Sequence, residues 1–553
     1  MKHFFTLVFG MLFSLGISAQ APLQWGIAAQ GQGNFYDDAA SVTFDSQNNL
    51  YVTGYFASDS VTFGNITLYT AGVADAYVVK YDAQLNPLWA VSFGGSAEEY
   101  GLGISCDSSD HIIVVGNFAS ASIVLGNDTL INQGTAGTPD MFITRLDANG
   151  NFIWSQRQGG RNWDNCAGVD MNTANGDIYV SAAYYLDTMF IGNDTLLNHG
   201  GYDMVLMKFD INGNYLWARN SGGNFNDLAN AVAFDVNGYV ITSGGFASDS
   251  MKFPTDTLIN PVTGLPETFV VKYDVNGNCI WAQRAGAGDN DHSVAVDVDQ
   301  SGTIFVGGHF HSGSFIFGND TLVNQGQGDV YLLVYDPNGN PLWAKAAGGI
   351  EQDFGLGVFV DAAGKIYYCG MFQSMSIDFG PYTLNNSNVN DNMFLIVYDA
   401  AGNETGALSG GGPGSDYLYS VVADPNGIYA VGSFGTPVLT MGTTTLTNAD
   451  ASGNTSDMFI ATTAIPLNTL SGQGENQFLV FPNPSKGIFN FTSTIEGSAD
   501  VRVYNSFGQE IISREETNAN NFQIDLSGEV DGTYFVQIIS DENIVTTKLV
   551  VHN

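Results

Sequence analysis

The chain has 553 residues, of which 13% are charged, and its formal net charge is −39. So acidic a protein is unsuited to nucleic acids and to anionic membrane surfaces, both of which are bound by basic residues. Aromatic residues make up 12% of the chain and glycines number 67, which argues against a disordered chain and favours short strands joined by tight turns.

Residues 1–20 have the pattern of a signal peptide. Lys2 lies before an apolar run from Phe4 to Ile17, and the small residues Ser18 and Ala19 stand near a cleavage point. No later stretch reaches 18 consecutive apolar residues, so no transmembrane helix is expected. The sequence therefore predicts a protein that is secreted or held on the outer cell surface.

Residues 21–465 contain a repeat of about 64 residues, which is the first feature to establish in such a chain. One marker is a tryptophan, mostly followed by a pair of glycines: Trp25, Trp89, Trp154, Trp217, Trp281 and Trp343. A second marker combines a small residue, an aromatic residue and a Thr-Leu pair at fixed offsets, and it occurs seven times between Gly54 and Leu446. In the last copy Gly406 stands where tryptophan is expected.

Each repeat is expected to form four strands, because apolar residues alternate with polar ones between turns rich in Asn and Gly. Such a unit cannot cover both faces of its own sheet, so its neighbours must do so. The fold predicted for residues 21–465 is an all-β, seven-bladed β-propeller. The array begins with a tryptophan strand and stops after the strand that starts at Asp457. We therefore favour a ring closed by one blade that the first and last segments share.

The repeat resembles bacterial SBBP-type β-propeller repeats. The stretch that carries the likeness runs from GxF through FGNDTL to GxxDxFVxKYDxxGNxLW. The resemblance implies a propeller fold and little about activity, since propellers have many functions.

After a linker at residues 466–476, the 64-residue pattern is absent. Residues 477–553 have the strand and turn pattern of a small antiparallel β-sandwich. Their motif residues are Phe481, Pro482, Asn483, Pro484, Gly508, Gly532, Tyr534 and Lys548. In that order and at the chain end they resemble the type A C-terminal sorting domain of the Bacteroidota type IX secretion system. The resemblance implies that the type IX secretion machinery is a partner and that the domain directs the chain across the outer membrane.

A set of acidic residues recurs at one position of the repeat: Asp37, Glu99, Asp227, Asp289, Asp353 and Asp416, with Asp164 close to it. In a ring they would form a circle of carboxylates that could hold a cation such as calcium. The alternative is that each accepts N–H groups within its own turn. No cofactor is predicted from this pattern.

No motif of a known catalytic class is found. His309 and His311 alternate on one predicted strand and could form half of a metal site, but the sequence supplies no third ligand. Accordingly, no catalytic, cofactor-binding or metal residue is predicted. The four cysteines are expected to be small buried residues, and the alternative is that two of them form one disulfide.

Four hairpins contain an Asp-Thr-Leu sequence that resembles the O-glycosylated sites of Bacteroidota proteins. The candidate threonines are Thr129, Thr195, Thr257 and Thr321. The alternative is a plain hairpin in which threonine favours the strand.

The function favoured by the sequence is that of a non-enzymatic binding, adhesion or scaffold protein with an unknown extracellular glycan or protein partner. The alternative is an extracellular hydrolase or lyase whose site is assembled from loops of several blades. Its candidate residues are polar or aromatic side chains that do not repeat: Arg161, Trp163, His292, His309 and His311.

Overall fold

The computed structural model describes residues 23–134, 137–186, 188–425, 427–450, 455–463, 478–481, 485–493, 498–505, 510–517, 521–530, 532–540 and 543–551. All regular elements in these ranges are β-strands. The same ranges contain no helix that is long and apolar enough to cross a membrane. The chain divides into two compact units at residue 465, and each is described by itself.

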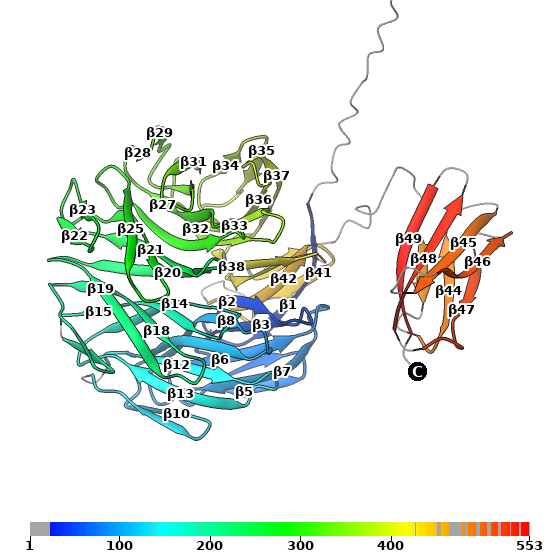
Figure 1. Ribbon diagram of the computed structural model, residues 1–553, viewed down its shortest axis with the longest axis horizontal. Coiled ribbons are helices and arrows are strands. Elements are labelled where there is room, and N and C mark those ends of the chain that lie inside the picture. The colour runs from blue at the N-terminus through cyan, green and yellow to red at the C-terminus, as the bar shows by residue number, and fades with distance from the viewer. Residues whose placement is uncertain are drawn as a thin grey trace, which may run out of the picture. The chain divides into compact units, whose positions relative to one another are not determined.

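The first unit consists of seven sheets in which four long antiparallel strands follow one another from the innermost to the outermost (Figure 1). In chain order the sheets are β2 (Asp37–Phe44), β3 (Leu50–Phe56), β6 (Asp75–Tyr81), β7 (Pro87–Phe93); β8 (Glu99–Cys106), β9 (Ile112–Phe118), β12 (Asp140–Leu146), β13 (Phe152–Gln158); β14 (Asp164–Met171), β15 (Ile178–Tyr185), β18 (Tyr202–Phe209), β19 (Tyr215–Ser221); β20 (Asp227–Asp235), β21 (Tyr239–Phe246), β24 (Glu267–Asp274), β25 (Cys279–Ala285); β26 (His292–Val298), β27 (Ile304–Phe310), β30 (Asp329–Tyr335), β31 (Pro341–Ala347); β32 (Asp353–Val360), β33 (Ile366–Phe372), β36 (Asn392–Tyr398), β37 (Glu404–Gly410); and β38 (Asp416–Asp424), β39 (Gly427–Phe434), β42 (Asp457–Thr463), β1 (Trp25–Gln32). We call these sheets blades one to seven.

Blade seven is built from both ends of the propeller sequence. The strand β1 pairs antiparallel with β42, so that Gly31 lies opposite Met458. The innermost strands contact one another in sequence order, and β38 of blade seven contacts β2 of blade one. In Figure 1 the first strand accordingly lies beside the last one of the ring. The all-β propeller fold is thereby confirmed, and its ring is closed by the shared blade.

A short hairpin joins the second and third strands of each blade at the outer rim. The hairpins are β4 (Ser60–Phe63) with β5 (Ile66–Tyr69), β10 (Ser122–Leu125) with β11 (Asp128–Ile131), β16 (Met189–Ile191) with β17 (Asp194–Leu196), β22 (Ser250–Lys252) with β23 (Thr257–Ile259), β28 (Ser314–Phe317) with β29 (Asp320–Val323), β34 (Ser376–Phe379) with β35 (Tyr382–Asn385), and β40 (Val438–Met441) with β41 (Thr444–Thr447). Their apolar side chains join the cores between blades.

The repeated tryptophan links successive blades. In four copies its indole N–H donates to a backbone carbonyl in a turn of the next blade, as Trp89 does to Ala148 at 3.1 Å and Trp217 does to Val275 at 3.0 Å. Trp25 instead donates to the carbonyl of Ser409 on the preceding blade, at 3.2 Å. The strand that contains Ser409 is the one in which Gly406 replaces the expected tryptophan.

The second unit contains two sheets around one core. One sheet is formed by β43 (Phe478–Phe481), β44 (Ile488–Ser493) and β47 (Asn521–Asp525), and the other by β46 (Glu510–Glu516), β45 (Ala499–Asn505), β48 (Gly532–Ser540) and β49 (Asn543–Val551). Both sheets contribute to a single apolar cluster that includes Phe491 and Val536.

Candidate functional site

Each innermost strand of the propeller carries a β-bulge at the same place. The register of the strand pair shifts there, and one residue is left without a cross-strand partner. These unpaired residues are Ala40, Leu102, Ala167, Asn230, Val294, Leu356 and Tyr419. A bulge re-aims a side chain, and here the same irregularity recurs in all seven blades.

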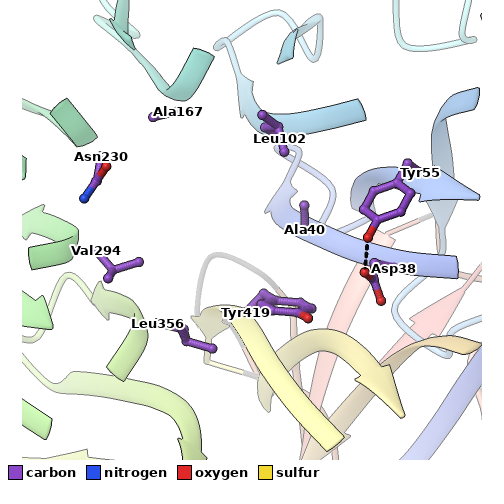
Figure 2. Close-up of a pocket in the computed structure, with 9 residues that line it drawn as sticks. All are labelled: Asp38, Ala40, Tyr55, Leu102, Ala167, Asn230, Val294, Leu356 and Tyr419. Carbon is purple, nitrogen blue, oxygen red and sulfur yellow. Dashed lines mark hydrogen bonds between the residues drawn. The ribbon is translucent and has the colours of Figure 1, made fainter. Parts of the chain in front are cut away.

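The seven bulge residues line a cavity of about 370 Å³ in the central channel, together with Asp38 and Tyr55. Figure 2 shows the side chains arranged around the open space. A second cavity of about 170 Å³ shares all seven bulge residues. Every one of them is half-buried, so the wall of the channel consists largely of aliphatic side chains that water can reach. Concave apolar surfaces of this kind are typical of binding sites.

Apart from Asn230, which lies across the open space, the polar side chains of the cavity gather on one side (Figure 2). The Asp38 carboxylate accepts the Tyr55 hydroxyl and, through Oδ1, the Ser456 hydroxyl at 3.2 Å. Tyr419 accepts a long hydrogen bond of 3.4 Å from Ser433. Burial and the nearby Asp38 raise the pKa of Tyr419, so its hydroxyl stays protonated at neutral pH.

A further pocket of about 380 Å³ lies between blades four and five and shares Asn230 with the channel. Its polar lining consists of Asn226, Asn230, Asn290 and His292. These are amide and imidazole groups, which are neutral hydrogen-bonding partners.

Three histidines gather beside this pocket. The rings of His292 and His309 are 4.3 Å apart, and those of His309 and His311 are 5.6 Å apart. Burial lowers the pKa of His292 to about 4, so this ring is neutral at pH 7. In the described ranges no group of three metal-binding side chains has the geometry to hold an ion. Of the residues proposed for an enzymatic site, the structure brings the three histidines together but places Arg161 and Trp163 on the loop before β14 of blade three.

The repeated acidic residues lie between blades rather than on an open ring. Asp227 and Asp353, for example, are fully buried and accept the hydroxyl of a serine at the end of the second strand, at 2.7 and 2.8 Å, as well as backbone N–H groups. The structure therefore gives these carboxylates the local hydrogen-bonding role. The prediction of Asp289 was wrong, because Asp291 occupies the position and accepts Ser312. Asp291 lies eight residues before the turn residue Asp299, whereas Asp297 lies inside β26.

A residue of the preceding blade faces each of these seven carboxylates, and in six of the seven it is a second acid. A methyl group built on Gly159 would lie 2.8 Å from Asp164 Oδ2 and 2.9 Å from Asp140 Oδ1, so both acids border this glycine. The other facing pairs are Asp457 with Asp37, Asp75 with Glu99, Asp203 with Asp227, Glu267 with Asp291, Asp329 with Asp353, and Asn392 with Asp416. The first glycine of the pair is thus explained, because a side chain at its position would collide with one of these facing residues.

Four of these seven junctions have either an arginine or histidine side chain in contact with an acid or a neutral facing residue. Arg157 contacts Asp140 at 2.9 Å, His199 contacts Asp203 at 2.8 Å, and Arg284 contacts Glu267 at 2.6 Å. In the fourth, the neutral Asn392 replaces an acid. The other three junctions, which we call bare junctions, have no cationic partner among the described ion pairs: Asp457 with Asp37, Asp75 with Glu99, and Asp329 with Asp353. Burial and the facing acid raise the pKa of Asp37 to about 7 and that of Asp329 to about 6.

The candidate glycosylation sites lie on the rim hairpins. The side chains of Thr129, Thr195, Thr257 and Thr321 are all exposed. The preceding aspartates have structural partners, since Asp128 accepts the N–H of Ser155 at 2.7 Å and Asp256 accepts that of Ala282 at 3.0 Å. The aspartates therefore hold each hairpin on its blade, whereas the threonine hydroxyls are accessible.

The hypothesis that these threonines carry O-glycans predicts an intact mass of the secreted protein above that of the polypeptide. Replacing the four threonines by alanine one after another should lower the mass in steps. Stability should change by less than about 0.5 kcal/mol per site, because the side chains are exposed. A secreted protein with the polypeptide mass would contradict the hypothesis.

The sorting motif can be located in part. Phe481 ends β43, Gly532 begins β48, and Lys548 lies in β49 opposite Phe535. Tyr534 is buried and donates its hydroxyl to the Val530 carbonyl at 2.7 Å. Pro482, Asn483, Pro484 and Gly508 lie outside the described residues, as does the predicted signal peptide. The four cysteines are free, and Cys166, Cys279 and Cys369 are buried.

Comparison with known proteins identifies the last segment. Residues 479–552 match the family described as the secretion system C-terminal sorting domain. An uncharacterized WD repeat-containing protein of Acanthamoeba polyphaga mimivirus is 25% identical over 76% of the chain and 36% of its own length. The regulatory protein FlaEY of Caulobacter vibrioides is 24% identical over 53% of the chain and 33% of its own length. The chain thus spans about a third of the length of the curated relatives it matches.

Solved structures with a similar fold include the Neurospora crassa Pan2 WD40 domain and a member of the duf4221 family from Bacteroides vulgatus. The first has a TM-score of 0.31 and 14% identity over 61% of this chain and 86% of that chain. The second has a TM-score of 0.31 and 11% identity over 80% of this chain and 97% of that chain. The chain is therefore a β-propeller protein that ends in a sorting domain of the type IX secretion system, and it is secreted or held on the outer cell surface.

Proposed function

We propose that the propeller is a non-enzymatic extracellular binding protein whose ligand enters the central channel. The proposal rests mainly on one observation, the half-buried aliphatic side chains that the bulges direct into the channel. Water-accessible apolar surface concentrated in a cavity is costly to the free protein and is relieved when a ligand covers it. The sorting domain at residues 479–552 agrees with an extracellular role.

The test compares the unaltered protein with Ala167→Trp, which would fill the channel from one bulge. Ala167 has no cross-strand partner, so a larger side chain there leaves the strand pairing of β14 intact. The matched control is Thr129→Trp, which adds the same ring to an exposed rim hairpin. A neutral solvatochromic dye, a glycan array and a peptide array serve as probes.

We expect the unaltered protein and Thr129→Trp to bind the dye and to give the same array signals, and Ala167→Trp to lose them. Thermal unfolding of all three proteins checks that the ring is intact. Signals that survive in Ala167→Trp, or blank arrays with no dye binding, would overturn the proposed function.

A second candidate function is that of a hydrolase or lyase, favoured by the pocket beside the three histidines. His292 lines this pocket and is neutral at pH 7, as a hydrogen-bonding or basic imidazole must be. Turnover of a polysaccharide or peptide panel that His292→Ala abolishes would support this candidate. Equal product formation by both proteins, or none by either, would count against it.

A further inference from the structure

Three carboxylates at one side of the channel mouth each accept a tyrosine hydroxyl. Besides Asp38 with Tyr55, Glu98 accepts Tyr100 at 2.9 Å and Asp391 accepts Tyr417 at 2.7 Å. These residues come from blades six, seven, one and two and from the loops that join them. We call Asp38, Glu98, Asp391, Tyr55, Tyr100, Tyr417 and Tyr419 the acidic mouth.

The tyrosine rings of the acidic mouth pack against one another. The rings of Tyr55 and Tyr100 meet edge to face at 4.6 Å, and those of Tyr417 and Tyr419 stack at 5.7 Å. Contacts between rings fix their orientation and leave faces that carry partial negative charge. Such faces attract cations within about 6 Å of the ring centre.

No basic side chain neutralises the acidic mouth in the part of the chain that the structure describes. None of the ion pairs includes Asp38, Glu98 or Asp391, and neither channel cavity is lined by lysine or arginine. Elsewhere the propeller does pair its acids, as Asp45 with Lys80 at 2.9 Å and Asp107 with Arg145 at 2.7 Å. The acidic mouth thus retains negative charge next to the open cavity.

The aliphatic part of the channel wall lies beside the acidic mouth. Asp38 and Tyr419 line the same cavity as Leu102, Val294 and Leu356. A ligand that matches both surfaces has a cationic head for the carboxylate and the rings, and an unbranched apolar stem for the wall. The side chain of lysine has this form, since it joins a compact ammonium to four methylene groups.

We propose that the channel mouth binds the side chain of a lysine exposed on an extracellular polypeptide. The proposal rests on the proposed function and narrows its ligand to one chemical class. The net charge of −39 would also attract a basic partner at a distance. An anionic ligand would meet the uncompensated carboxylates, and a purely apolar one would leave them unused.

The experiment titrates the full-length secreted protein by calorimetry with three blocked tripeptides. The first carries lysine at its centre, the second carries norleucine, which keeps the stem without the ammonium, and the third carries acetyl-lysine. The variant Asp38→Asn removes the charge at constant shape, and its matched control is Asp378→Asn, an exposed residue of strand β34.

We expect the lysine peptide to bind more tightly than the other two and to weaken as salt concentration rises. Asp38→Asn should weaken the lysine peptide by about tenfold or more, whereas Asp378→Asn should leave it unchanged. Equal binding of the norleucine peptide, or full affinity of Asp38→Asn for lysine, would overturn the proposal. If the unaltered protein still binds the dye and Ala167→Trp does not, the proposed function stands and only the ligand class is wrong. If neither the lysine peptide nor the dye binds, the proposed function is overturned as well.

Discussion

Replacing Asp416 by alanine should lower the free energy of unfolding of the propeller by about 3–5 kcal/mol. The side chain is fully buried in the closing blade and accepts the Thr436 hydroxyl at 2.5 Å, the Thr436 N–H at 3.1 Å and the Gly412 N–H at 2.9 Å. Its facing residue is the neutral Asn392, so alanine relieves no charge repulsion and leaves these donors without an acceptor. Chemical denaturation followed by tryptophan fluorescence measures the change.

Two further variants test whether burial and hydrogen bonding make Asp416 necessary for stability. Thr436→Val removes only the hydroxyl donor and should cost about 1 kcal/mol. Asp378→Ala removes an exposed acid of the rim and should change stability by less than about 0.5 kcal/mol. Equal losses for Asp416→Ala and Asp378→Ala would show that burial and hydrogen bonding are not what make Asp416 necessary.

The stability of the propeller should increase as the pH falls from 8 to 5. Burial and a facing acid raise the pKa of Asp37 to about 7, and those of Asp75 and Asp329 to about 6, above the ordinary value of 3.8. The folded protein therefore holds protons at the bare junctions that the unfolded chain releases. A raised pKa gives stability that is complete below the unfolded value and is lost as the pH rises through the folded value.

The variant Asp329→Asn should remove the contribution of one bare junction to the change of stability with pH. Asparagine imitates the junction of Asn392 with Asp416, so we expect it to raise the stability, and to raise it by about 1.4 kcal/mol more at pH 8 than at pH 5. The reverse variant, Asn392→Asp, should destabilise the protein more at pH 8 than at pH 5. Thermal unfolding in EDTA and with added calcium is the measurement. If calcium stabilises the unaltered protein but not Asp329→Asn, the junction holds a cation. That result would contradict the prediction that the junction holds a proton.

The repeat was sufficient to predict the strands, because the same strand and turn residues recur at fixed positions in each copy. Trp89 and Trp154, for example, are equivalent residues of successive copies. The repeat also predicts the shared closing blade, which the pairing of β1 with β42 confirms. The position of Asp291 was missed although a signal was present, since it lies four residues after Ala287 as Asp353 does after Gly349. Distance from the glycine pair, rather than from the following acid, would have found it.

The channel could not be predicted by the same reasoning. Its lining positions recur, but their residues do not, as Ala40, Asn230 and Tyr419 show. A bulge residue has no cross-strand partner, so the alternation of the strand places no requirement on its identity. The three carboxylates of the acidic mouth also come from different blades and share no repeat position. Only the folded ring brings them to one opening.

The closing blade affects the order in which the protein can form. Gln30 of the first strand bonds Thr447 in a hairpin 417 positions later, so this contact waits until almost the whole propeller has emerged. Until then the chain presents two unpaired strand edges, which are prone to join other chains. Pairing across so great a sequence separation is also slow. Because the sorting domain comes after the propeller and a linker in the sequence, a chain that carries this domain also has every strand needed to close its ring.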